Sequence, residues 1–282
     1  MKSTMKIKQV TNYMALLRNL RNIIRAGVSD KHMKMVVEAI HNPEAVEKSK
    51  QFPYRFLSAY KELENEPGST KVLAALSDAV ELSVQNIPEF TGKTFVTCDT
   101  SRSMDGAMSS KSKMTRREVG CLFGAMVHKK SEDAITSVFA TDFVPVNLNA
   151  RDSMFTNLKK MFDTDTNGYG TEAWKIMDYL NKHKVFVDRI IMFSDMQCYD
   201  AGHHMYGDER SFYEGLVKYR KNVNKNVFVY SFDLASYGTL QVPNDDPRVC
   251  IAGGFSDKVL NFIPMFEGSR TNMLDVIENI RI

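Results

Sequence analysis

Oxygen-bearing side chains gather at the end of one short apolar segment. Residues 94–98 are apolar or β-branched, which predicts a buried strand. Asp99, Ser101 and Ser103 follow on alternate positions, so a carboxylate and two hydroxyls would lie together beyond the strand's carboxyl end, where open α/β sheets bind ligands. Oxygen ligands suit Mg²⁺, Mn²⁺ or Ca²⁺ and do not suit zinc. The alternative is a strand followed by a turn in which these side chains only cap a helix.

Two later segments carry further oxygens toward the same sheet edge. A glycine-rich run over 167–170 leads to the hydroxyl of Thr171 at a predicted helix start, and the apolar strand 190–193 leads to Asp195. The order D-x-S-x-S, threonine, aspartate resembles the metal-ion-dependent adhesion site of von Willebrand factor A domains. The resemblance implies a divalent metal with Ser101, Ser103 and Thr171 as direct ligands. Asp99 and Asp195 would bind it directly or through water, and one coordination position would stay open for an acidic group or solvent.

Other groupings near these segments have weaker support. His203 and His204 follow the second aspartate and would suit a transition metal, but a solvated loop is the much better explanation of the pair. Asp163, Asp165 and Asn167 are spaced like calcium ligands, yet the glycine and distal glutamate of an EF-hand are misplaced. A metal-dependent hydrolase is disfavoured, because the hydroxyls would be occupied as ligands and no histidine or lysine adjoins them as a general base. We therefore expect a protein that is not an enzyme.

Composition indicates a globular protein in a reducing compartment. The 282 residues are 43% hydrophobic and 25% charged, and no apolar run is long enough to span a bilayer. The N-terminus has a charged start without an apolar core behind it, which does not match a signal peptide. Cys98, Cys121, Cys198 and Cys250 lie far apart and form no C-x-x-C, so we expect reduced, mostly buried thiols and a cytoplasmic protein.

After a linker at residues 87–92, the pattern alternates between strands and helices. This alternation predicts an α/β fold with a doubly wound, mostly parallel sheet. The segments 134–139 and 144–148 are too close for a crossover helix, so they must form a hairpin with one antiparallel edge strand. The predicted strands are 94–98, 134–139, 144–148, 188–194, 227–233 and 248–252. The predicted helices are 113–129, 152–162, 172–182, 210–222 and 256–266.

The first 90 residues read as helices joined by short breaks, as in helical-repeat proteins. The predicted helices are 11–27, 31–41, 43–50, 54–64 and 70–85. We therefore expect three parts: a helical repeat segment over 1–90, an A domain over 91–268 and a C-terminal helical tail over 269–282.

Basic residues are concentrated at the N-terminus. Residues 1–34 hold eight lysines and arginines against the single acid Asp30, whereas residues 91–282 hold equal numbers of acidic and basic residues. At helical spacing, Arg18, Arg21 and Arg25 fall opposite an apolar face, so they could contact successive phosphates. Further cations that would add to a salt-dependent affinity for a polyanion are Lys2, Lys6, Lys8, Lys31 and Lys34. The alternative is an ordinary solvated helix face.

Helical repeats followed directly by an A domain resemble the carboxyl-terminal part of the TROVE/Ro ribonucleoprotein family. The matching segments are 15–22 (ALLRNLRN), 52–60 (FPYRFLSAY), 91–93 (TGK), 193–195 (FSD) and 250–255 (CIAGGF). Members of this family resemble a ring of helical repeats closed by the A domain, and they bind small non-coding RNAs and single-stranded RNA ends. This chain has only the last few helices, too few to close a ring, and the sequence leaves open whether several copies rebuild one.

The resemblance implies an RNA-binding, ribonucleoprotein-associated protein with a metal in its A domain. Its expected partner is a small non-coding or single-stranded RNA, contacted by Arg18, Arg21, Arg25, Lys31 and Lys34. The alternative is a protein-interaction or assembly module whose metal captures a carboxylate from a partner protein or from another copy, with no role for RNA. No membrane partner is expected.

Overall fold

The computed structural model describes residues 13–110, 112–196, 211–235, 246–253, 256 and 258–268. The chain divides into two compact units, residues 1–87 and 88–282. Several sequence predictions lie outside the described residues: the tail 269–282, Cys198, the histidine pair 203–204, and Lys2, Lys6 and Lys8. Within the described part, no helix is both long and apolar enough to cross a lipid bilayer.

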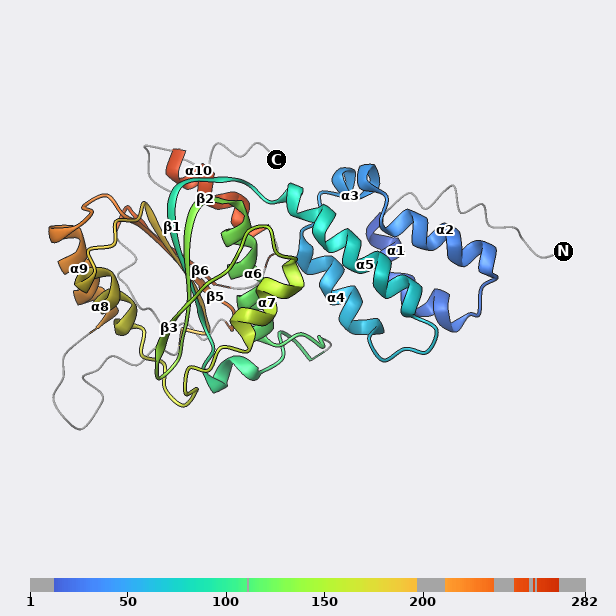
Figure 1. Ribbon diagram of the computed structural model, residues 1–282, viewed down its shortest axis with the longest axis horizontal. Coiled ribbons are helices and arrows are strands. Elements are labelled where there is room, and N and C mark those ends of the chain that lie inside the picture. The colour runs from blue at the N-terminus through green and yellow to red at the C-terminus, as the bar shows by residue number, and fades with distance from the viewer. Residues whose placement is uncertain are drawn as a thin grey trace. The chain divides into compact units, whose positions relative to one another are not determined.

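The first unit consists of helices whose apolar faces pack together (Figure 1). Leu16, Leu17 and Leu20 of the first helix are buried, as the amphipathic pattern predicted, while Ile23 and Ile24 are only partly buried. Asn42 caps one helix start by accepting a hydrogen bond from the Ala45 N–H, and Pro43 follows at the first helical position. The helices are α1 (Tyr13–Arg25), α2 (Asp30–Ile40), α3 (Pro43–Ser49), α4 (Pro53–Leu63) and α5 (Thr70–Ser83).

The second unit is a six-stranded sheet in the order β3-β2-β1-β4-β5-β6. All neighbouring strands are parallel except the edge pair β2 and β3, which is antiparallel. The predicted fold class, including the hairpin edge strand, is therefore confirmed. The strands are β1 (Phe90–Asp99), β2 (Ser131–Phe139), β3 (Phe143–Val146), β4 (Arg189–Ser194), β5 (Phe228–Asp233) and β6 (Val249–Gly253).

Helices cover both faces of this sheet (Figure 1). On one face, α8 and α9 bury Phe95, Ile190 and Val229 in a continuous apolar cluster. On the other face α6 comes close to the sheet, because a Cβ on its Gly124 would lie only 2.7 Å from the Cys98 Sγ. The helices are α6 (Arg116–Lys130), α7 (Met154–Phe162), α8 (Trp174–Lys182), α9 (Phe212–Asn222) and α10 (Phe262–Gly268).

Boundaries differ from the sequence prediction mainly where loops carry turns of their own. The helix expected from residue 172 begins at Trp174, because the Ala173 N–H bonds to the Thr171 carbonyl in a preceding turn. Strand β1 begins at Phe90, inside the predicted linker. Cys98, Cys121 and Cys250 are free and buried, as expected of reduced thiols.

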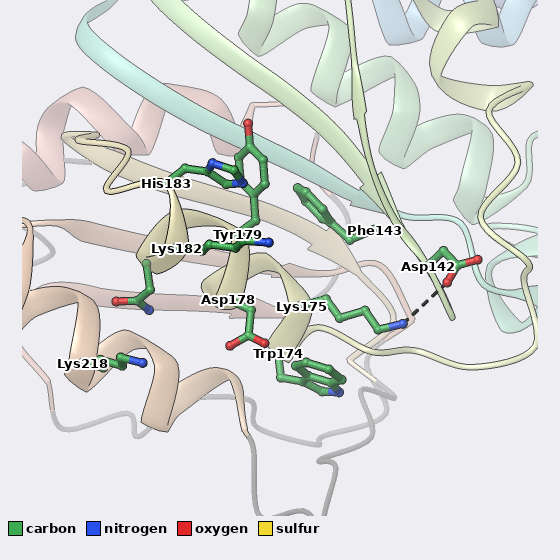
Figure 2. A pocket seen from close by; sticks show the side chains of 10 residues that line it. Asp142, Phe143, Trp174, Lys175, Asp178, Tyr179, Lys182, His183 and Lys218 are labelled. Atoms are coloured by element: carbon green, nitrogen blue, oxygen red, sulfur yellow. Dashed lines mark ion pairs between the residues drawn. The ribbon is translucent and has the colours of Figure 1, made fainter.

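A hollow opens beside the edge strand β3, against α8 and α9 (Figure 2). It measures about 720 Å³ and is lined by aromatic, acidic and basic side chains from these three elements. This hollow lies outside every site that the sequence predicted.

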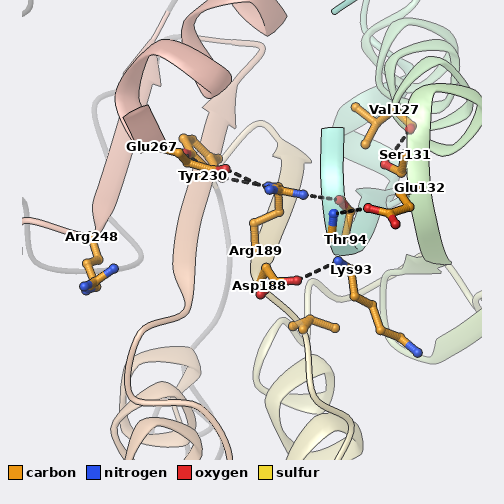
Figure 3. Close-up of polar contacts among 12 residues, drawn as sticks. Lys93, Thr94, Val127, Ser131, Glu132, Asp188, Arg189, Tyr230, Arg248 and Glu267 are labelled. Carbon is orange, nitrogen blue, oxygen red and sulfur yellow. Dashed lines mark hydrogen bonds and ion pairs between the residues drawn. The ribbon is translucent and has the colours of Figure 1, made fainter. Parts of the chain in front are cut away.

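A buried ion pair ties α10 to the sheet (Figure 3). The guanidinium of Arg189 on β4 donates two hydrogen bonds of 2.7 Å to the Glu267 carboxylate and one of 2.8 Å to the Thr94 hydroxyl. The Tyr230 hydroxyl donates to the same carboxylate at 3.1 Å. Because the Arg189 side chain is only 4% exposed, this network fixes the position of α10 against β4 and β5.

Candidate functional site

The carboxyl ends of β1 and β4 lie side by side in the middle of the sheet. Cys98 pairs in register with Phe193, so Asp99 and Ser194 leave the two strands at the same edge. The strand order reverses here, because β2 lies on one side of β1 and β4 on the other. Such a switch point is where open α/β sheets bind ligands. The Ser194 hydroxyl donates to the Asp99 carboxylate at 2.7 Å and links the two strand ends directly.

The loop after β1 brings the first three predicted ligands together. The Ser101 N–H donates to Asp99 Oδ1 at 2.8 Å, which folds the loop back over the strand end. The hydroxyl oxygens of Ser101 and Ser103 lie 3.1 Å apart. Asp99 and Ser101 are buried, whereas Ser103 is only partly buried. The cluster is therefore reached by solvent mainly at Ser103.

The loop that carries Thr171 is fastened to the loop after β1. The Arg102 N–H donates to the Gly168 carbonyl at 3.0 Å, and the hydroxyls of Thr100 and Thr166 lie 2.8 Å apart. Thr171 is 3% exposed, so its hydroxyl belongs to the buried side of this loop. These bonds hold the predicted threonine ligand at the same sheet edge as the serines.

Gly170 lets the same loop approach the β2–β3 hairpin. Its N–H donates to the Thr141 hydroxyl at 2.7 Å, and a Cβ at this position would lie 3.1 Å from that oxygen. A Cβ at this position would require the Thr141 hydroxyl to shift by a few tenths of an ångström. This contact holds the Thr171 loop against the β2–β3 hairpin.

Two buried carboxylates define the electrostatics of the site. Asp99 and Asp195 are both 0% exposed. The pKa of Asp99 is raised to about 6, mainly by burial and also by the charge of Asp195, although hydrogen bonds from Ser101 and Ser194 act in the opposite direction. Two ionised carboxylates in one buried site are costly unless a cation compensates them. Together with the three hydroxyls, the donor set fits a hard divalent cation such as Mg²⁺, Mn²⁺ or Ca²⁺.

The candidate site depends on hydroxyl ligands. Among the residues that the structure describes, no three His, Cys, Asp or Glu side chains are grouped so as to hold a metal. Asp163, one of the alternative calcium ligands, is instead paired with Lys159 at 2.5 Å. The serines and Thr171 are therefore as necessary to the candidate site as the two aspartates.

The arginines of α1 point to solvent, but two of them are paired with glutamates of the same unit. Arg21 contacts Glu62 of α4 at 3.0 Å, and Arg25 makes two hydrogen bonds of 2.8 Å to Glu66, just beyond α4. Both pairs join residues 41 positions apart, so α1 and α4 run in the same direction. The predicted arginine face exists, but glutamates neutralise part of its charge.

The other predicted RNA-binding cations are exposed as expected. Arg18, Lys31 and Lys34 are all exposed on α1 and α2. Lys34 lies 3.9 Å from Glu38 on its own helix, a weak contact. Across the described part of the chain, no acidic side chain forms an ion pair with Arg18 or Lys31. These two are the cations most available to a phosphate.

Three residues important to these sites were missed from the sequence. Ser194 precedes a predicted ligand but was read as part of the strand, although a polar residue at the end of an apolar strand was a usable signal. Glu62 and Glu66 repeat the four-residue spacing of Arg21 and Arg25, which would have revealed the pairing once α1 and α4 were known to be neighbours.

Each of the two units matches a model of a known protein domain. A model of the TROVE domain matches residues 7–71, and a model of the Ro60 vWA (von Willebrand factor A) domain matches residues 93–267. The chain belongs to the TROVE/Ro family. The resemblance drawn from the sequence is thereby confirmed, and the matched ranges contain all of the candidate metal ligands and the basic positions on α1 and α2.

Individual relatives match parts of the chain. The RNA-binding protein RO60 of Deinococcus radiodurans is 23% identical over 203 residues, which cover 67% of this chain and 38% of that protein. The telomerase protein component 1 of Mus musculus is 40% identical over 52 residues, which cover 18% of this chain and 2% of that protein. The crystal structure of the Deinococcus radiodurans Ro protein has a TM-score of 0.76 at 20% identity, over 90% of this chain and 52% of that one. The chain thus shares the Ro fold and spans about half the length of the solved protein.

Proposed function

We propose that this chain is a non-enzymatic RNA-binding protein of ribonucleoprotein particles, and that its vWA domain holds a divalent cation. The observation that supports RNA binding best is the row of exposed cations on the TROVE-matching helices. Arg18, Arg21 and Arg25 lie about one turn apart on α1, and Lys31 and Lys34 follow on α2. Guanidinium groups at this spacing suit successive phosphates of an RNA backbone.

The ion pairs on α1 are compatible with RNA binding. The side chains of Arg21 and Arg25 remain 47% and 60% exposed despite their glutamate partners. Exposed pairs of this kind contribute little to stability, so a polyanion can compete for the arginines. Arg18 and Lys31 need no such exchange and would make the first contacts. This arrangement recognises the phosphate backbone rather than base sequence.

A charge-reversal variant tests the proposal. Arg18→Glu with Lys31→Glu should weaken binding of a fluorescein-labelled hairpin RNA at least about tenfold, because two phosphate contacts become repulsive. Fluorescence anisotropy at a fixed KCl concentration would measure the change. The variant Arg151→Glu with Lys225→Glu makes the same charge change at exposed positions of the vWA domain and should bind nearly as well as the unmodified chain. Equal affinities for all three proteins would contradict the proposal.

The cation would be held by Asp99, Ser101, Ser103, Thr171 and Asp195. The fit rests on the buried carboxylate pair, whose mutual repulsion a divalent ion would offset. When bound, the ion supplies an electrophilic position for an acidic ligand. The hydrogen bonds from Ser101 and Ser194 to Asp99 orient the carboxylate, and the Gly168 and Thr166 contacts keep Thr171 in place. We propose Mg²⁺, with Mn²⁺ and Ca²⁺ as other ions of suitable chemistry.

A second candidate function uses the same cation to capture a carboxylate of a partner protein or of another copy. It is favoured by the partial exposure of Ser103, and by Tyr169, which is 84% exposed on the loop that carries Thr171. An exposed aromatic side chain beside an open coordination position suits a protein interface. Light scattering with Mg²⁺, with EDTA and with Asp99→Ala tests this function. Loss of an oligomer in the latter two supports it, and a mass indifferent to both changes argues against it.

A further inference from the structure

The hollow beside α8 has the chemistry of a binding site that neither proposed function uses. Its wall comes from α8, its rim from α9, and its far side from the start of edge strand β3 (Figure 2). The volume of about 720 Å³ lies within the range of small-ligand sites. It is distinct from the arginine face of α1, which belongs to the other unit.

Aromatic rings form one side of the hollow. The rings of Phe143 and Tyr179 lie 5.0 Å apart, and the Tyr179 ring lies 4.8 Å from the His183 ring. Trp174 extends this side toward the amino end of α8 (Figure 2). Flat aromatic faces at the wall of an open hollow are suited to stacking against planar bases.

Two exposed lysines also line the hollow. Lys182 ends α8 and Lys218 lies on α9, and both are exposed. Neither forms an ion pair within the part of the chain that the structure describes. Lys175 is different, because it bonds to the Thr141 carbonyl and lies 3.6 Å from the Asp142 carboxylate. Lys182 and Lys218 therefore supply the positive charge available to an anionic ligand.

The acidic residues of the hollow narrow the choice of ligand. Asp142 and Asp178 both line it. Their carboxylates would repel an acidic peptide, but they can accept hydrogen bonds from the amino group of a base or from a ribose hydroxyl. Aromatic rings, available lysines and carboxylate acceptors together match a nucleotide better than a purely anionic chain.

We infer that this hollow binds a nucleotide of single-stranded RNA. The base stacks on the side formed by Trp174 and Tyr179, and its phosphate contacts Lys182 and Lys218. This inference rests on the proposed RNA binding only for the choice of ligand class, since the site itself lies wholly within the vWA unit. The Trp174 indole N–H bonds to Glu172, next to the predicted ligand Thr171, so the hollow and the candidate metal site share one loop.

Trp174 is the single tryptophan of the chain, so its fluorescence reports on the hollow directly. Titration with adenosine monophosphate, and with an eight-nucleotide oligoadenylate, should quench this fluorescence to saturation. Lys182→Glu with Lys218→Glu should raise the midpoint of the oligoadenylate titration at least about fivefold, because two phosphate contacts are reversed. The charge-matched variant Lys221→Glu with Lys225→Glu changes exposed lysines that do not line the hollow and should shift the midpoint less than about twofold.

The outcomes separate this inference from the proposed function. The Arg18→Glu, Lys31→Glu variant should leave quenching by adenosine monophosphate unchanged even if it abolishes hairpin binding. Absence of quenching by both nucleotides, or an equal shift in the two lysine variants, would overturn the inference without touching the role of α1. Quenching by an acidic octapeptide but not by oligoadenylate would also overturn it and would assign the hollow to protein binding.

Discussion

The residues with the largest electrostatic consequence are Asp99 and Asp195. Both carboxylates are fully buried, and the charge of Asp195 disfavours ionisation of Asp99. Ser101 and Ser194 supply hydrogen bonds to Asp99, but hydrogen bonds alone do not neutralise two charges. A divalent cation would convert this repulsion into binding energy, so the response of stability to metal is the property most sensitive to these residues.

Asp99→Asn should separate the repulsion between the two carboxylates from the stabilisation by a bound cation. Mg²⁺ at a hundredfold excess over its Kd should stabilise the unmodified chain by about 2.7 kcal/mol, which raises the Tm of a unit of this size by roughly 5–10 °C. In the variant, the amide can still accept the Ser101 N–H bond, so the metal-free fold should be at least as stable, but the shift with Mg²⁺ should vanish. Differential scanning fluorimetry with and without EDTA measures both.

The control for that experiment is Asp105→Asn. Asp105 is an exposed carboxylate of the same loop, outside the predicted ligand set, and lies 3.8 Å from Arg117. This variant should keep the full Mg²⁺ response. If Asp99→Asn also keeps it, the metal assignment is wrong.

Removal of the competing glutamates should increase RNA affinity. Glu62→Gln with Glu66→Gln frees the guanidinium groups of Arg21 and Arg25, so binding of the labelled hairpin should strengthen about three- to tenfold, the gain of one or two phosphate contacts. Glu44→Gln with Glu47→Gln removes the same charge from exposed positions of α3 and serves as the control. An affinity that rises equally in both variants would show a general charge effect, and no rise in either would place the RNA elsewhere.

At the scale of elements, the central position of β1 follows from the order of strands. Its parallel neighbours β2 and β4 lie on opposite sides of it, so the strand order reverses at β1 and creates the switch point at Asp99. The sequence predicted this arrangement well, because apolar strands alternate with amphipathic helices and the β2–β3 connection is too short for a crossover. The predicted starts were displaced by four residues at β1, by two at α8 and by six at α10, which was predicted to begin at residue 256 and begins at Phe262.

Contacts between segments distant in the chain could not be predicted from the sequence. The ion pairs of Arg21 and Arg25 depend on which helices become neighbours, and the Arg189–Glu267 pair joins residues 78 positions apart. Local periodicity carries no information on such partners. The candidate metal ligands could be placed at one sheet edge from the sequence, because each ends or begins an element whose position in a parallel sheet is fixed by topology.

The buried pair between β4 and α10 makes a prediction about stability. Arg189→Met should leave the Glu267 carboxylate without its main partner and lower the free energy of unfolding by about 3–5 kcal/mol. Urea denaturation measures the loss. Arg189→Met with Glu267→Met should recover most of it, because apolar residues can replace a buried ion pair at little cost. A single variant as stable as the unmodified chain would mean that α10 is not held by this network.

At the scale of the whole molecule, the chain consists of two units, and each unit matches a domain of the TROVE/Ro family. The chain combines helices matched by the TROVE model with a sheet matched by the Ro60 vWA model, and it spans about half of the solved Ro protein. Ring closure and RNA-end threading belong to the expectations for longer relatives. Binding to an RNA backbone requires only the cations that this chain presents.

The salt dependence of RNA binding tests the central claim most directly. Each phosphate contacted by a lysine or arginine contributes about −0.7 to the slope of log affinity against log salt for single strands. A single-stranded 12-nucleotide RNA, titrated by anisotropy between 50 and 300 mM KCl, should give a slope steeper than about −2 for the unmodified chain. Arg18→Glu with Lys31→Glu should reduce its steepness by at least about 1.4, the share of two contacts. A slope near zero, or an identical slope in the two proteins, would contradict RNA binding through α1 and α2.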